Sequence, residues 1–215
     1  MASPEALLVA LGASPGAARS VADELAARHG EPHRRHHSLE HVGEVLAEVD
    51  RLLPTEPDAD GTAVRLAAWF HDAIHDPTDG PGVSEAASAE LAVDRLPALA
   101  LADRDRLADE VARLVRLTAT HRTEAVDRSG AVLLDADLWI LSSPPERYDR
   151  YVAEVRAEYG HVGDAAWVAG RGSLLAGFLA RADELYGAGA ADDRRARRAR
   201  AVANLQRELA ALRPG

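Results

Sequence analysis

The segment "AAWFHDAIHDP", residues 67–77, decides how this chain is interpreted. Apolar residues lead directly into His71 and Asp72, and a second His-Asp pair follows after two more apolar residues. Because the apolar spacing here is helical, we expect one helix over residues 61–76 with this pair near its buried side. An ionised carboxylate on that side is costly unless a partner compensates it. The segment therefore predicts either a bound cation or a buried, hydrogen-bonded histidine beside an aspartate that caps a helix.

Apolar residues recur with the period of an α-helix along nearly the whole chain, whereas strand-like alternation is almost absent. Segments rich in proline and glycine separate the periodic stretches. We predict an all-α helical bundle that forms one domain over residues 1–215. The expected helices cover residues 4–12, 16–29, 38–53, 61–76, 84–96, 104–120, 131–141, 146–159, 164–186 and 190–212.

Composition excludes several classes of protein. The 25 basic residues, all arginine, are outnumbered by 35 acidic ones, and a net charge of −10 argues against binding duplex nucleic acid or an anionic membrane. The chain has no cysteine, so disulfides, thiolate metal sites and a cysteine nucleophile are excluded. No basic leader and no run of roughly 20 apolar residues occurs, so we expect a cytoplasmic protein. The sequence does not predict an oligomeric state.

Two further segments carry polar residues in apolar surroundings. In a helix, His37 and His41 share one face about one turn apart, either as exposed rings or as part of a site. The segment "AVLLDADLWIL", residues 131–141, holds Asp135 and Asp137 in an otherwise apolar helix. These two side chains lie about 200° apart around a helix, so at most one of them faces the same centre as the histidines. Either aspartate could instead pair with an arginine.

The order of a histidine, a His-Asp doublet and a distant aspartate resembles the HD superfamily of metal-dependent phosphohydrolases. Within it, "RRHHSLEHV" is similar to the pattern R-x-Y-H-N-L-E-H-V of a bacterial family of predicted metal-dependent HD phosphohydrolases. "AAWFHDAIHDP" is similar to that family's A-x-W-F-H-D-A-I-Y-D-P, and the resemblance covers about residues 20–212. The chain departs from the patterns at His36, Ser38 and His75, which stand where Tyr, Asn and Tyr are usual.

The resemblance implies one divalent metal ion held by His41, His71, Asp72 and Asp137, the last because it lies in an "ADL" string. Imidazole and carboxylate ligands suit Mn, Co, Ni, Fe, Zn or Mg without choosing among them. Such an ion lowers the pKa of bound water from about 15.7 towards 7. As a ligand of the ion that activates this water, Asp72 is also expected to be a catalytic residue.

The resemblance further implies that His37 is the catalytic general acid, since "HSLEH" is similar to the H-N-x-x-H of cyclic nucleotide phosphodiesterases. Phosphate oxygens favour arginine, and polar residues near the motifs can complete the pocket. The residues expected to bind substrate are Arg35, Glu85, His121 and Arg171.

We therefore expect a metal-dependent phosphohydrolase that cleaves a small phosphoester, a nucleotide or a related phosphorylated metabolite, with metal-activated water. One alternative is a non-catalytic sensor that keeps the ligand-binding pocket. The other is an HD-fold di-iron oxygenase, for which His75 and His121 are the histidines placed to hold a second iron.

Overall fold

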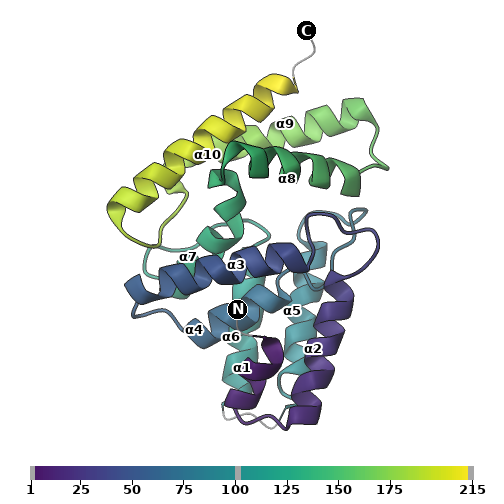
Figure 1. The fold of residues 1–215 in the computed structure, drawn as a ribbon, viewed down its shortest axis with the longest axis vertical. Helices are drawn as coiled ribbons and strands as arrows, with labels where there is room; N and C mark the ends of the chain where they lie inside the picture. Colours follow the sequence, from purple (N-terminus) through teal and green to yellow (C-terminus); the bar gives the residue numbers. More distant parts are fainter. Residues whose placement is uncertain (1–2, 100–102, 213–215) are drawn as a thin grey trace.

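The computed structural model describes residues 3–99 and 103–212, which form helices joined by turns and loops (Figure 1). These two ranges contain no β-strand, so the all-α prediction is confirmed. The α-helices are α1 (Pro4–Ala10), α2 (Pro15–His29), α3 (Leu39–Leu52), α4 (Gly61–Phe70), α5 (Val83–Arg95), α6 (Arg104–Leu117), α7 (Arg128–Asp137), α8 (Pro145–Glu158), α9 (Asp164–Ala180) and α10 (Ala191–Ala211). Short 3-10 helices are η1 (Leu53–Thr55), η2 (Leu138–Ser142) and η3 (Ala182–Glu184).

Several helices begin where the sequence supplies a capping side chain. Ser3, Ser14, Asp60 and Asp127 each accept a hydrogen bond from a backbone N–H in the first turn of the helix that follows. Proline occupies the first turn of α1, α2 and α8, where its missing N–H costs nothing. These helix starts were therefore readable from sequence to within a few residues.

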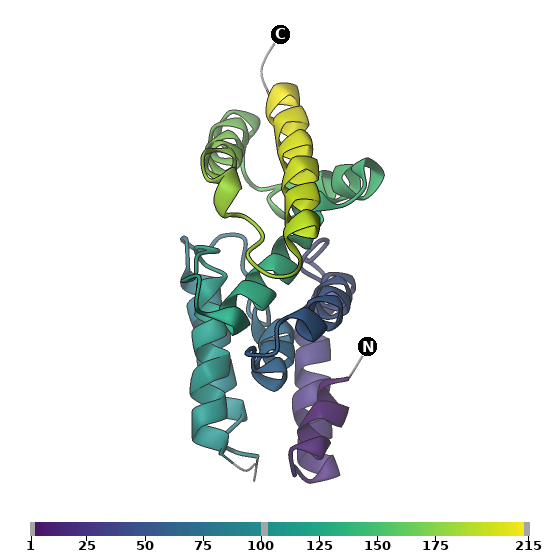
Figure 2. The same cartoon turned by 90° about the vertical axis from the view of Figure 1, so that its left-hand side faces the viewer.

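The buried apolar side chains form two clusters. The first gathers residues of α1 to α7, and the second gathers residues of η2, α8, α9 and α10. In Figures 1 and 2, α8 to α10 lie together toward the end that carries the C-terminus, with α1 to α6 toward the other end. Because η2 follows α7 directly, one continuous segment serves both clusters. No helix in the described ranges is long and apolar enough to cross a membrane.

The helix expected over residues 61–76 is wrong at its end, because α4 stops at Phe70. Beyond it, the carbonyl oxygens of Asp72 and Ala73 accept hydrogen bonds from the Arg34 guanidinium at 2.6 and 3.1 Å. These side-chain donors satisfy carbonyls that leave the helix, so the chain can turn there. The His-Asp doublet therefore lies in a turn at the end of α4 and not on a continuous helical face.

The helical relation expected between His37 and His41 is also wrong, because α3 begins at Leu39 and His37 precedes it. The two rings nevertheless approach to 6.1 Å between centroids. Likewise, the helix expected over residues 131–141 changes to 3-10 geometry after Asp137, and that over 164–186 ends at Ala180. Polar contacts in the turns, which periodicity does not report, decide these ends.

The most buried charge of α10 ties this helix to the first cluster. Arg197 is 1% exposed, and its Nη1 lies 2.8 Å from Glu48 Oε1 on α3. Its Nη2 donates to the carbonyl of Asp135 at 2.8 Å, and its guanidinium lies over the ring of Tyr186. The arginine-rich first half of α10 therefore includes a buried structural contact.

We expect Arg197→Ala to lower the free energy of unfolding by about 3 kcal/mol, because it removes one member of a buried ion pair and leaves a void over Tyr186. Urea denaturation measures the change. The matched control is Arg195→Ala, whose side chain is 75% exposed and whose loss should leave stability nearly unchanged. Equal losses in the two variants would contradict a structural role for Arg197.

Candidate metal centre

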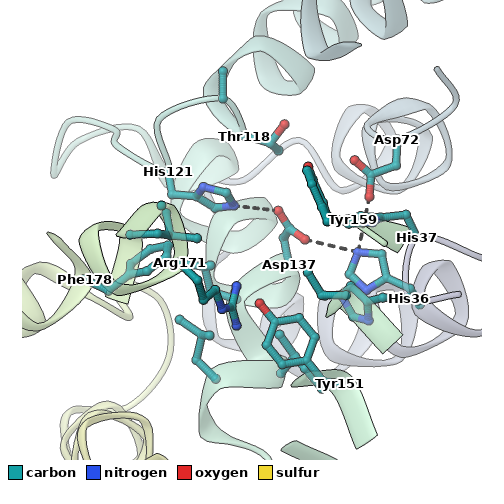
Figure 3. Close-up of a pocket in the computed structure, with 18 of the residues that line it drawn as sticks. His36, His37, Asp72, Thr118, His121, Asp137, Tyr151, Tyr159, Arg171 and Phe178 are labelled. Carbon is teal, nitrogen blue, oxygen red and sulfur yellow. Dashed lines mark hydrogen bonds and ion pairs between the residues drawn. The ribbon is translucent and has the colours of Figure 1, made fainter. Parts of the chain in front are cut away.

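A cavity of about 460 Å³ lies between the two apolar clusters and contains most of the polar residues that the sequence singled out (Figure 3). One end is lined by His37, His41, Asp72, His121 and Asp137. The opposite wall comes mainly from η2, α8 and α9. Residues that lie far apart in the sequence therefore face one space.

The four ligands expected from sequence converge at the polar end. His41 Nε2 lies 3.1 Å from His71 Nε2 and 3.2 Å from Asp137 Oδ1. Asp72 Oδ2 lies 3.1 Å from His71 Nε2 and 3.5 Å from His41 Nε2. Neighbouring ligand atoms around an ion at 2.0–2.2 Å are separated by roughly 3.0–3.4 Å. The spacing therefore fits a divalent ion held by His41, His71 and Asp137, whose ligand atoms all lie within 4.8 Å of one another, with Asp72 next to both histidines.

The tautomer of His71 also suits a metal ligand. Its Nδ1–H donates to the carbonyl of Ala68 at 2.9 Å, which leaves the lone pair of Nε2 directed at the other three side chains. Burial opposes a charge on this ring, but the carboxylate of Asp72 outweighs burial and raises the pKa of His71 to about 9. A metal ion and this proton therefore compete for the same nitrogen.

Asp135 and Asp137 have opposite environments, as their angular separation requires. Asp137 faces the cavity, where Oδ2 accepts a hydrogen bond from His121 Nε2 at 2.8 Å. Asp135 points away from the centre and accepts from the backbone N–H groups of Gly187 and Ala188 at 3.0 and 2.6 Å. Burial raises the pKa of Asp135 to about 6. The choice of Asp137 over Asp135 agrees with this geometry.

His37 is held by a buried carboxylate that the sequence analysis missed. Glu158, at the end of α8, has its Oε2 2.6 Å from His37 Nδ1. Its Oε1 accepts from the backbone N–H groups of Arg35, His36 and His37 at 2.6, 2.9 and 3.0 Å. Burial alone lowers the pKa of His37, but the hydrogen bond to Glu158 and the nearby Asp72 raise it overall. The ring is therefore fixed in orientation and favoured in its protonated form.

His75 lies beside this pair. Its ring centroid is 4.0 Å from that of His37, and its Nε2 is 3.8 Å from Glu158 Oε2. These three residues form a second group whose ligand atoms lie within 4.8 Å of one another. Glu158 already accepts four hydrogen bonds, so little of its capacity is left for an ion. The group therefore resembles a support for His37 more than a second metal centre.

The residues expected to bind substrate are placed differently from one another. Glu85 and His121 line the cavity. Arg171 also lines it, but its Nε and Nη2 donate to Glu208 at 2.7 and 3.1 Å. Arg35 is exposed and donates to the carbonyls of Pro32 and Arg34. The structure therefore does not bring the Arg35 guanidinium to the cavity, and it gives Arg171 a structural partner.

Arg34, which sequence reasoning passed over in favour of Arg35, organises the site. Its guanidinium is buried and donates to the carbonyls of His37 and Asp72 at 3.0 and 2.6 Å. The family pattern did contain a signal, since its fixed R falls on Arg34 and its variable position on Arg35. No comparable signal in sequence separates Glu158 from the other glutamates of α8.

The two neighbouring aspartates give a matched test. Asp137→Ala should lose bound metal yet fold, because it removes a ligand atom from the centre. Asp135→Ala should bind metal normally but lose about 2–4 kcal/mol of stability, because the buried N–H of Ala188 and the partly buried N–H of Gly187 lose their acceptor. Metal content after dialysis and urea denaturation of the metal-free proteins measure both effects. The assignment fails if Asp135→Ala, and not Asp137→Ala, is the variant without metal.

Comparison of the chain with protein-family models, with curated proteins and with solved structures found no match. The resemblance to the HD superfamily therefore depends on the sequence motifs alone.

Proposed function

We propose that this protein is a metal-dependent phosphohydrolase that cleaves a small phosphate ester. The observation that carries the proposal is the convergence of His41, His71 and Asp137 within ligand distance of one another at the end of a cavity, with Asp72 beside both histidines. A divalent ion held there would lower the pKa of a water molecule and draw the phosphoryl oxygens toward it. Imidazole and carboxylate donors fit Mn, Fe, Co, Ni or Zn best, and Mg less well.

The protein's own residues supply the remaining steps. His37 lines the same cavity, and its Nδ1–H is bonded to Glu158, which leaves Nε2 as the nitrogen that can meet the substrate. A protonated Nε2 can donate to the oxygen that leaves phosphorus when the ester bond breaks. His121 bonds Asp137 Oδ2 and so fixes which oxygen of that carboxylate faces His41. Glu158 and His121 are thus positioning residues.

Two alternatives remain distinguishable by experiment. A two-iron oxygenase is favoured by one observation, the second group of His37, His75 and Glu158, and it predicts two metal ions per chain. A non-catalytic sensor predicts ligand binding without turnover. Our proposal predicts one tightly bound ion per chain and hydrolysis without a requirement for oxygen.

The direct test is a phosphatase screen with protein reconstituted separately with Mn, Co, Ni, Mg and Zn. We expect release of inorganic phosphate from phosphomonoesters, its loss on chelation, and a lower melting temperature for the metal-free protein. Metal affinity should rise with pH up to about 9, because the ion must displace the proton from His71. Metal binding with no phosphate release from any ester would instead support the sensor.

A second test separates catalysis from metal binding. His37→Ala should keep its metal and lose about 10²–10⁴ in rate on an alkyl phosphate, with a smaller loss on nitrophenyl phosphate, whose leaving group needs little protonation. Glu158→Gln keeps an acceptor for the three backbone N–H groups but removes the charge beside His37. Its rate loss should also be larger on the alkyl phosphate than on nitrophenyl phosphate, but smaller than that of His37→Ala. Equal losses on both esters would remove the general-acid role.

A further inference from the structure

The cavity has an apolar wall as well as the polar residues of the candidate metal centre. Aromatic side chains of Tyr151, Tyr159, Trp167 and Phe178 form part of this wall, three of them labelled in Figure 3. Aliphatic side chains complete this wall: Leu138, Ile140, Leu141, Val155, Val162 and Leu174. One small space therefore joins a cluster of metal-ligand type to an apolar, ring-rich surface.

Few charged groups accompany this apolar wall. Of the cavity-lining residues in the described part of the chain, Arg171 is the one arginine, and both oxygens of Glu208 hold its guanidinium. That guanidinium also lies 5.1 Å from the ring centroid of Tyr151. Polyphosphate chains and sugars need several unoccupied donors, which this wall does not offer. The wall instead suits an apolar group, because burying apolar surface away from water is favourable.

We infer that the substrate is a phosphate monoester whose alcohol part is a compact apolar group that carries a ring. This inference rests on the proposed function, because it places the phosphoryl group at His41, His71, Asp72 and Asp137 and the organic group against Tyr159 and Trp167. The two aromatic rings lie 6.0 Å apart between centroids, with Tyr159 on the α8 side and Trp167 on α9. Leu174, on the same helix, is 49% exposed although it lines the cavity, as expected at the rim of a site for an apolar ligand.

Helix α9 offers a matched pair of glycines for the test. Gly170 lines the cavity, and a Cβ added there meets no atom within 4 Å. Gly177 has the same open surroundings and is not among the residues that line the cavity. Both residues are exposed. Gly170→Leu should therefore fold as well as Gly177→Leu while filling the apolar end of the cavity.

The experiment compares 2-phenylethyl phosphate with glycerol 1-phosphate, two esters of primary alcohols whose leaving groups are similar. We expect the manganese-loaded protein to prefer the phenylethyl ester by about tenfold or more in kcat/KM. Gly170→Leu should remove this preference and keep activity on glycerol phosphate, and Gly177→Leu should match the unsubstituted protein. Binding of the non-hydrolysable 2-phenylethylphosphonate and 2-hydroxyethylphosphonate, measured by calorimetry, gives the same comparison without turnover.

The outcomes separate the two proposals. Selective phosphonate binding without hydrolysis of any ester would overturn the proposed function and keep the apolar site. Hydrolysis with equal kcat/KM for the two esters, or an equal loss on both in Gly170→Leu, would overturn the apolar site and keep the phosphohydrolase.

Discussion

The hydrogen bonds of the buried Arg34 guanidinium hold the candidate site together. This one side chain donates to the carbonyls of His37, Asp72 and Ala73. It thereby fixes the loop before α3 against the turn after α4, two segments more than thirty residues apart in the chain. A hydrogen bond from a charged donor to a buried carbonyl is stronger than a neutral one. Without Arg34, the carbonyls of Asp72 and Ala73 would lose these hydrogen bonds, and the turn that carries His71 and Asp72 would be less stable.

Two sets of charged side chains differ in their partners. Some pairs close the fold: Arg197 with Glu48 connects α10 to α3, and Arg171 with Glu208 connects α9 to α10. Asp72 and Asp137, at the candidate metal centre, form no ion pair with an arginine in the described part of the chain. Asp72 and Asp137 meet histidines instead, and the charges of those rings outweigh burial and keep the pKa values of both carboxyl groups well below their usual range. A carboxylate paired with imidazole can exchange that partner for a metal ion, which an arginine pair does not permit.

The position of the cavity explains why its two ends differ. The candidate ligands come from α3, the turn after α4, and α7, whose buried apolar residues belong to the first cluster. The aromatic wall comes from α8 and α9, whose buried residues belong to the second cluster. The site therefore forms where the two clusters meet, and η2 joins them directly after Asp137.

The sequence by itself determined the helical class and most helix starts, and it singled out His41, His71 and Asp137, which the fold brings together. Periodicity shows which residues face a core, and capping residues show where helices begin. Isolated His and Asp residues in apolar segments indicate that burying a polar or charged group costs free energy, which a binding partner must offset. The angle between Asp135 and Asp137 even indicated that only one of them reaches the centre, and the "ADL" resemblance chose Asp137.

Only the tertiary structure decided where helices end at the site and which charged residues support it. The turn at His71 and the irregular segment at His37 depend on Arg34 and Glu158, whose partners lie 38 and 121 residues away. The same holds for Arg35, exposed beside its buried neighbour, and for Arg171, held by Glu208. Local periodicity carries no information about a partner so distant, because a hydrogen bond between remote segments exists only after the chain has folded.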